Sequence, residues 1–192
     1  MDLGSGTGWL TAILNEIGPS TGVELSENTI TASKKKYPSV EFIAGNFFEV
    51  DIQEKQYDIV ISQEVIEHVD DQNAYLEIAF NSLKKGGYLI LTTPNAHNFN
   101  HWTNKALDDW NLQPVENWMT INELKNLLLN KFRILKTKTV IAKFGSKGLI
   151  YKLLSSSKVN RVLESLRIKN FKDDSALSIG LGLHIVVLAQ KQ

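Results

Sequence analysis

Three glycines at alternate positions near the start of the chain constrain the fold more than any other feature. Gly4, Gly6 and Gly8 stand in the run DLGSGTGWL, which leads into a helical pattern of apolar residues. Glycine lets the backbone turn tightly and approach a ligand without a Cβ in the way. The free N–H groups and the positive end of the following helix favour a negatively charged ligand group. The run therefore predicts a strand–loop–helix unit with a ligand at the loop.

An acidic residue follows this loop at a characteristic distance. Glu24 comes 20 residues after Gly4, at the end of an apolar run, and a carboxylate there can accept hydrogen bonds from both hydroxyls of a ribose. A dinucleotide fingerprint would have its third glycine where this chain has Trp9, which disfavours an NAD or FAD protein. Two simpler interpretations stay open, a glycine-rich turn without a ligand and a solvated acid at a strand end.

Apolar runs alternate with helical patterns along the chain, as in a parallel sheet wrapped by helices. We predict strands at 21–24, 40–44, 57–62, 87–93, 132–139 and 183–189, and helices at 8–17, 26–36, 71–83 and 121–130. The predicted signals for the helix starts are Thr7, Ser26 with Glu27, Asp70 and Asp71, and Thr120 with Glu123 as a capping box. The order predicts an α/β fold with a doubly wound, mostly parallel sheet.

The composition excludes several classes of function. The 192 residues suffice for one domain with a buried core, which we expect to span 1–192. Basic and acidic residues balance at 21 each, so nothing indicates a nucleic-acid partner. The absence of cysteine excludes disulfides, thiolate nucleophiles and cysteine-bound zinc, and it favours a cytoplasmic location.

Two insertions interrupt the strand–helix alternation, at 95–118 and 145–178. Insertions between sheet elements are usually lids or substrate walls. Within the second, 149–172 mixes apolar with basic residues, which fits either a lid on its own domain or, less favoured, a helix in peripheral contact with a membrane. The most apolar stretch, 176–189, is interrupted by His184 and is shorter than the roughly 17 residues of a minimal membrane span, so it predicts a buried strand.

The strand expected before the glycine loop is nearly absent. Only Met1 precedes Asp2, whereas such a loop follows an apolar strand at the centre of the sheet. We therefore expect an unpaired channel through the core, an N-terminally incomplete version of a longer protein, and an unstable or insoluble chain.

Five blocks along residues 2–95 resemble the class I S-adenosylmethionine-dependent methyltransferases, in particular the ubiquinone and menaquinone O-methyltransferase type. They are DLGSGTGWL, GVELS, FIAGNF, YDIVISQEVIEHV and LKKGGYLILTTPN. The resemblance implies S-adenosylmethionine as cofactor and a Rossmann-like, seven-stranded sheet. It also implies that the last strand is antiparallel and lies next to the fifth.

The resemblance also implies cofactor-binding residues by position. Asn46 stands where the family commonly has aspartate, and its amide oxygen can still accept a hydrogen bond from the adenine amino group. Gln63 and Glu64 would lie beside the reactive sulfonium. The other implied residues are Asp2, Gly4 and Gly6 for the methionine end, Glu24 for the ribose and Phe47 for the adenine, with Gly8 and Leu25 as further cofactor-binding residues.

The segment QEVIEH places Glu64, Glu67 and His68 at helical spacing, so a helix there would put them on one face. Three roles stay open. They can hold a divalent metal, with Glu116, Gln113 or water as a further ligand. His68 can be a general base, with Glu64 in the catalytic group. All three can also be structural.

Methyl transfer from a sulfonium mainly needs an aligned acceptor. We expect a small-molecule acceptor and favour O-methylation of a phenol, quinol or sugar hydroxyl over N- or C-methylation. A catalytically silent S-adenosylmethionine-binding module is the alternative. The sequence leaves the acceptor and the oligomeric state open.

Overall fold

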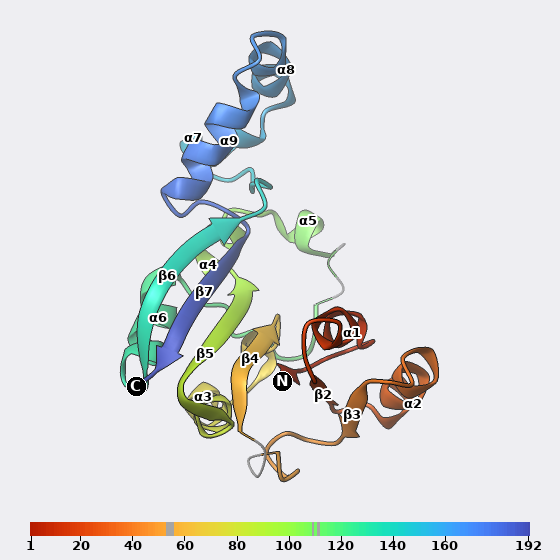
Figure 1. Cartoon of the computed structure of the whole chain (residues 1–192). Helices are drawn as coiled ribbons and strands as arrows, with labels where there is room; N and C mark the ends of the chain where they lie inside the picture. Colours follow the sequence, from red (N-terminus) through yellow and green to blue (C-terminus); the bar gives the residue numbers. More distant parts are fainter. Residues whose placement is uncertain (53–55, 109, 111) are drawn as a thin grey trace.

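The computed structural model in Figure 1 describes residues 1–52, 56–108, 110 and 112–192. One seven-stranded sheet has the order β3-β2-β1-β4-β5-β7-β6, and β7 alone runs antiparallel to its neighbours. The strands are β1 (Asp2–Leu3), β2 (Thr21–Glu24), β3 (Glu41–Ala44), β4 (Tyr57–Gln63), β5 (Leu83–Pro94), β6 (Phe132–Val140) and β7 (His184–Lys191). The predicted Rossmann-like sheet with an antiparallel last strand beside β5 is therefore confirmed.

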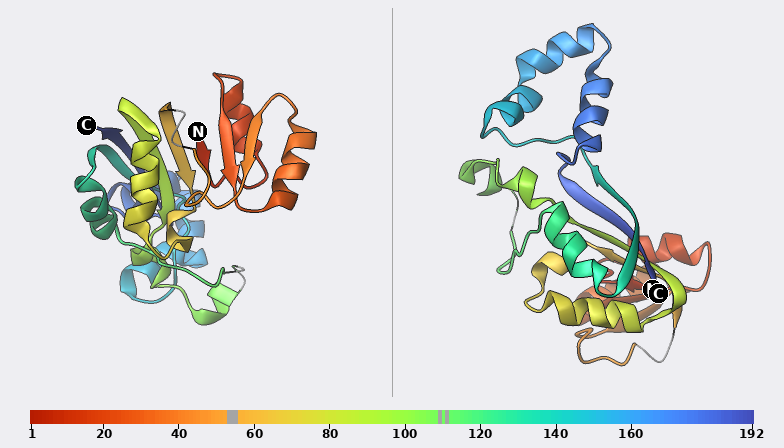
Figure 2. Two further views of the ribbon diagram at one scale, coloured as in Figure 1. Left: turned by 90° about the horizontal axis from the view of Figure 1, so that it is seen from below. Right: turned by 90° about the vertical axis from the view of Figure 1, so that its left-hand side faces the viewer.

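Four helices correspond to the predicted ones: α1 (Trp9–Asn15), α2 (Glu27–Lys36), α3 (Gln72–Asn81) and α6 (Ile121–Leu129). The right-hand view of Figure 2 shows α3 and α6 on one face of the sheet and α1 on the other. The apolar core contains, among others, Leu3, Leu89, Leu91, Leu124 and Leu128, all fully buried. Leu3 belongs to this core, so the strand that leads into the glycine loop is anchored in it.

The helix starts test the predicted caps. Ser26 accepts a hydrogen bond from Thr29 N at 3.2 Å, Asp71 accepts one from Ala74 N at 2.9 Å, and Thr120 forms a complete capping box. The cap predicted at Thr7 is wrong. Gly8 occupies the N-cap of α1 in a left-handed conformation, and no side chain caps that helix.

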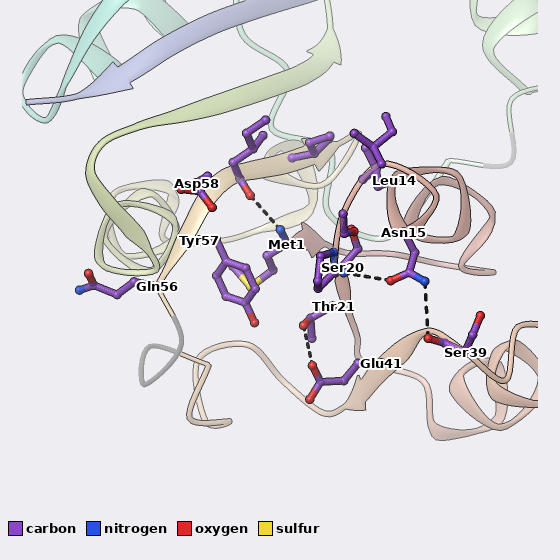
Figure 3. A pocket seen from close by; sticks show the side chains of 15 residues that line it. Met1, Leu14, Asn15, Ser20, Thr21, Ser39, Glu41, Gln56, Tyr57 and Asp58 are labelled. Carbon is purple, nitrogen blue, oxygen red and sulfur yellow. Dashed lines mark hydrogen bonds between the residues drawn. The ribbon is translucent and has the colours of Figure 1, made fainter.

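The first strand is short, and a cavity adjoins it. Asp2 pairs with Gly22 of β2 and with Ile61 of β4, while the terminal amine of Met1 donates to Ile59 O at 2.8 Å. A cavity of about 750 Å³ lies beside Met1 between the starts of β2 and β4, where Thr21 and Tyr57 are among its lining residues (Figure 3). The cavity lies at the amino ends of these two strands, opposite the glycine loop, and the expected channel through the core stays a prediction. Instability of the chain stays a prediction.

The second insertion forms a helical arm, residues 145–181, that rises beyond the end of the sheet between β6 and β7 (Figure 1). Its helices are α7 (Leu149–Ser155), α8 (Ser157–Ser165) and α9 (Lys169–Ser178). The mixed apolar and basic segment 149–172 is thus not one continuous helix, because Ser156 is extended and Arg167 is left-handed with φ 59°. Among the described residues, no helix has the length and apolar character needed to span a membrane.

Three short helices complete the described secondary structure: η1 (Ile66–His68), α4 (Ala96–Phe99) and α5 (Asn104–Asp108). The helix η1 is a single 3-10 turn just after β4. The helices α4 and α5 belong to the first insertion, between β5 and α6. All three therefore lie in connections that follow the carboxyl ends of β4 and β5.

Candidate active site

The glycine loop lies between β1 and α1, and its three glycines all have positive φ angles, 84° at Gly4, 50° at Gly6 and 73° at Gly8. A Cβ on Gly4 would lie 2.4 Å from Val65 Cγ2, and one on Gly8 would lie 2.5 Å from Phe42 Cζ. A Cβ on Gly6 would meet no atom within 4 Å. Packing therefore requires Gly4 and Gly8 to be glycine, whereas Gly6 borders open space that a ligand can use.

A hollow of about 210 Å³ opens beside this loop. Asp2 is buried at its base, accepts a hydrogen bond from Thr11 Oγ1 at 2.7 Å, and has a carboxyl pKa that burial raises. The hollow brings together residues predicted at the methionine end and at the sulfonium, namely Asp2, Gly4, Gly6, Gln63 and Glu64. Gly8 is not part of this lining and serves as the N-cap of α1.

Glu24 connects the loop to the end of β2. Its Oε2 accepts from Gly6 N and its Oε1 accepts from Ser26 N, both at 3.1 Å. Each carboxylate oxygen retains a further lone pair for a ligand hydroxyl. The position of Glu24 beside the loop is compatible with a contact to the ribose, and this contact stays a prediction.

A second hollow, of about 560 Å³, is lined by the two residues predicted at the adenine, Asn46 and Phe47, and by Leu25, predicted to bind the cofactor. Asn46 Oδ1 already accepts from Phe48 N at 3.1 Å, which leaves one lone pair on that oxygen. The rings of Phe47 and Phe48 lie 4.8 Å apart and provide apolar surface. His68 also lines this second hollow.

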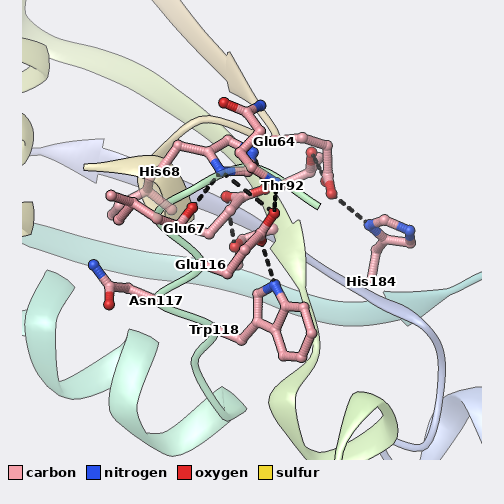
Figure 4. A network of polar contacts seen from close by, with 12 residues as sticks. Glu64, Glu67, His68, Thr92, Glu116, Asn117, Trp118 and His184 are labelled. Atoms are coloured by element: carbon pink, nitrogen blue, oxygen red, sulfur yellow. Dashed lines mark hydrogen bonds and ion pairs between the residues drawn. The ribbon is translucent and has the colours of Figure 1, made fainter. Parts of the chain in front are cut away.

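Glu64 and His184 form a contact that the sequence reasoning missed (Figure 4). Nδ1 of His184 lies 2.7 Å from Oε2 of Glu64, and Thr92 Oγ1 donates to Oε1 of Glu64 at 2.6 Å. Glu64 borders the hollow beside the glycine loop. The sequence feature that could have indicated this contact is His184 itself, because it interrupts the apolar run 176–189.

Glu67, three positions after Glu64, has a buried carboxyl group, with 1% of the residue's surface exposed. Thr93 Oγ1 donates to its Oε2 at 2.9 Å. Burial, and then the negative charge of Glu64, raise the pKa of Glu67 to about 7. A carboxyl with such a pKa is near half protonation at neutral pH.

The common helical face predicted for Glu64, Glu67 and His68 is wrong. Only Ile66–His68 is helical, as one 3-10 turn, and Glu64 has a left-handed φ of 53°. Glu64 contacts His184 and Thr92, Glu67 contacts Thr93, and His68 Nδ1 lies 2.9 Å from Val115 O. Glu64 therefore has partners of its own, whereas Glu67 Oε1 and His68 Nε2 lie 3.8 Å apart.

The metal hypothesis finds no support in the part of the chain that the structure describes. No group of three or more His, Cys, Asp or Glu side chains there can hold a metal ion. Glu116, named as a further ligand, accepts hydrogen bonds from Gln113 N at 2.8 Å and from Trp118 Nε1 at 2.7 Å. His68 Nδ1 lies 3.8 Å from Glu116.

Described residues of the first insertion, 95–118, contact one another and the segments that flank the helical arm. Asn98 Oδ1 accepts from Trp102 Nε1 at 2.8 Å, and its amide donates to Lys143 O and Leu181 O. The apolar cluster contains Phe99, Trp102, Trp110, Trp118 and Leu183. The insertion is therefore tied to the base of the helical arm, and its role as a substrate wall stays a prediction.

Comparison with known proteins gives the family. A model of the methyltransferase domain matches residues 1–165, so the chain belongs to this methyltransferase family. A ubiquinone biosynthesis O-methyltransferase of Bradyrhizobium sp. is 32% identical over 124 residues, which cover 62% of this chain and 47% of that protein. A probable S-adenosylmethionine-dependent methyltransferase of Mycolicibacterium smegmatis is 28% identical over 100 residues, 52% of this chain and 39% of that protein. The chain spans less than half of the length of these two relatives.

Solved structures agree on the fold. A SAM-dependent methyltransferase of Thermotoga maritima, described as a possible histamine N-methyltransferase, matches with a TM-score of 0.69 at 21% identity and covers 100% of this chain and 80% of that one. An S-adenosylmethionine-dependent methyltransferase of Mesorhizobium loti also matches with a TM-score of 0.69, at 15% identity. At these identities the likeness concerns the fold alone.

Proposed function

We propose that this chain binds S-adenosylmethionine along the carboxyl end of its parallel strands and transfers the methyl group to a hydroxyl of a small molecule. The observation that carries the proposal is the hollow beside the glycine loop, where Gly6 leaves open space and Glu64 provides a carboxylate. When bound, S-adenosylmethionine supplies a methyl group on a positively charged sulfur that is a good leaving group. Membership of the methyltransferase family supports the same cofactor.

The residues present fit such a cofactor at each of its ends. Exposed backbone and the start of α1 suit the methionine carboxylate, Glu24 has lone pairs for the ribose hydroxyls, and the second hollow offers the ring of Phe47 and the amide of Asn46 to the adenine. Acceptor alignment is the main demand of the reaction. A hydroxyl acceptor is supported by the histidine–carboxylate pair beside the hollow, which can take up a proton, and by the O-methyltransferase among the relatives.

Calorimetric titration of matched glycine variants tests the cofactor site. Gly6→Ala and Gly86→Ala place a Cβ at positive φ, 50° and 79°, with no atom within 4 Å, so the direct backbone effect is similar. Only Gly6 borders the hollow beside the loop. We expect Gly6→Ala to weaken S-adenosylmethionine binding about tenfold or more, and Gly86→Ala to leave it unchanged.

Two further measurements complete this test. S-adenosylhomocysteine should bind and NAD should not. Methyl release should then occur with a catechol or a sugar and not with a primary amine. Preference for NAD, or unchanged binding by Gly6→Ala, would overturn the cofactor assignment. Binding without transfer to any hydroxyl would leave a silent binding module, and transfer to the amine alone would make the protein an N-methyltransferase.

A further inference from the structure

The pair of Glu64 and His184 is built from distant parts of the chain. Glu64 follows β4 and His184 begins β7, 120 positions later, with β5 lying between these two strands. In the ladders, Gln63 pairs with Thr92 of β5, and His184 pairs with Pro94. The contact therefore crosses the carboxyl end of β5, next to the glycine-loop hollow that Glu64 borders.

Glu64 is held toward His184 by its backbone as well as its side chain. Its φ of 53° is left-handed, and its N–H donates to Thr92 O at 3.1 Å. Such a conformation costs a non-glycine residue about 1 to 2 kcal/mol and persists only where its surroundings enforce it. Thr92 provides this enforcement twice, through its carbonyl and through the 2.6 Å bond from its hydroxyl.

This geometry determines which nitrogen of His184 is available to accept a proton. A carboxylate only accepts hydrogen bonds, so Nδ1 of His184 donates its proton to Glu64. This bond leaves Nε2 as the nitrogen that can accept a proton. Within the described residues Nε2 has no hydrogen-bond partner, and the side chain is partly exposed, at 16%. A carboxylate that orients one nitrogen while the other takes a proton is an arrangement that many hydrolases use.

We propose that His184 is the general base for methyl transfer and that Glu64 is its positioning residue, an inference that rests on the proposed function. Nε2 of His184 accepts the proton of the acceptor hydroxyl while the oxygen forms its bond to the methyl carbon. The bond between that carbon and sulfur breaks, and its electron pair stays on sulfur. The imidazolium that results lies against the Glu64 carboxylate and later releases its proton to water.

The same geometry disfavours His68, which the sequence suggested as the base. His68 lines the second hollow with Asn46 and Phe47, on the side predicted for the adenine. Its Nδ1 is bound to Val115 O at 2.9 Å. Of these two histidines, only His184 contacts a residue that borders the glycine-loop hollow.

The acidity of the acceptor tests this proposal, with catechol and a nitrocatechol as probes. A nitrocatechol is largely ionised near neutral pH and needs no base, whereas catechol must lose a proton during the reaction. His184→Asn keeps an amide donor near Oε2 of Glu64 but removes Nε2. We expect it to lower kcat for catechol about 100-fold, and for the nitrocatechol less than about threefold. His68→Asn should change the two rates by a similar factor.

Binding measurements and a second variant keep the test decisive. Glu64→Gln leaves the imidazole in place but removes its carboxylate partner, and it should slow catechol more than the nitrocatechol. Calorimetry should give unchanged S-adenosylmethionine affinity for His184→Asn, which shows an intact site. Equal effects of the His184 and Glu64 variants on both phenols, or none, would overturn the base assignment alone. If the unmodified protein binds the cofactor but methylates neither phenol nor any sugar, the proposed function and this inference fail together.

Discussion

The carboxyl end of the sheet and the helical arm are organised in opposite ways. At the sheet end, Asp2 and Glu67 are 1% exposed and their carboxyl groups are bonded to threonines of other elements. In the arm, Leu149, Phe171 and Ile179 are 77%, 76% and 72% exposed. Polar groups are thus buried near the glycine loop, while large apolar groups are exposed in the arm.

This difference indicates which contacts stabilise each region. The sheet end depends on contacts between strands that are far apart in sequence, so a change there should affect the whole fold. The arm contributes Tyr151 and Ala176 to a small buried cluster with Phe144, which directly precedes the arm. Regions with few buried contacts open locally at low free energy, and changes in the arm should stay local.

The largest expected difference comes from removing a leucine side chain in each region. Leu89 is fully buried in β5, and Leu166 of the arm is 60% exposed. Leu89→Ala should lower the free energy of unfolding by about 2 to 5 kcal/mol. Leu166→Ala should change it by less than about 0.5 kcal/mol. Urea denaturation measures both, and equal losses would show that the arm unfolds as part of the core.

The second difference concerns a glutamate in each region and depends on pH. Burial raises the pKa of Glu67 to about 7, above its ordinary value of 4.5, so the folded state binds this proton more tightly than the unfolded state. Stability therefore falls as pH rises through this interval. Glu67→Gln, which still accepts from Thr93, should match the parent protein near pH 4 and exceed it by on the order of 3 kcal/mol near pH 8.

Glu164 of the arm provides the control for this pH dependence. It is exposed, and its hydrogen bond with Lys169 lowers the pKa of its carboxyl. Glu164→Gln should therefore bring no gain in stability as pH rises. A gain at alkaline pH from Glu164→Gln, or none from Glu67→Gln, would contradict the contrast between buried and exposed carboxyl groups.

The smallest expected difference in the free energy of unfolding comes from removing one helix cap in each region. Thr120 caps α6 on the sheet, and Ser156 caps α8 in the arm by accepting from Val159 N at 3.3 Å. Thr120→Ala should lower the global free energy of unfolding by about 1 kcal/mol. Ser156→Ala should speed hydrogen exchange in α8 and leave the global value unchanged, which exchange and urea experiments together can check. A global loss from Ser156→Ala would show that α8 is coupled to the sheet.

The sequence predicted the features that depend on neighbouring residues. Ser26, Asp71 and Thr120 cap helices because a side chain bonds a backbone group three residues on, and this needs no tertiary information. The seven-stranded sheet and the antiparallel last strand next to the fifth followed from the resemblance to the methyltransferase family. The glycine loop was also identified, since positive φ angles favour glycine.

The sequence did not predict features that depend on distant contacts. Helical spacing suggested one face for Glu64 and His68, but Thr92 of the neighbouring strand holds Glu64 in a left-handed conformation. The partner of Glu64 is His184, 120 positions away. At Thr7, the cap failed because Gly8 itself takes the capping position at φ 73°. In each case the conformation depends on the folded surroundings or on a loop geometry that the residue type alone does not specify.

The helical arm leaves and re-enters the sheet at neighbouring points. Val140 of β6 pairs with His184 of β7, and Leu183 N donates to Ile141 O at 3.0 Å. In terms of chain topology, the arm is an enlarged hairpin loop, and the pairing of β6 with β7 holds its two ends together. Loops closed in this way tolerate changes of length at small entropic cost. We therefore expect that the outer part of the arm can be shortened or extended while the strand register, and with it the position of His184, stays the same. The base of the arm is different, because Gly180 O and Leu181 O accept hydrogen bonds from Asn95 and Asn98.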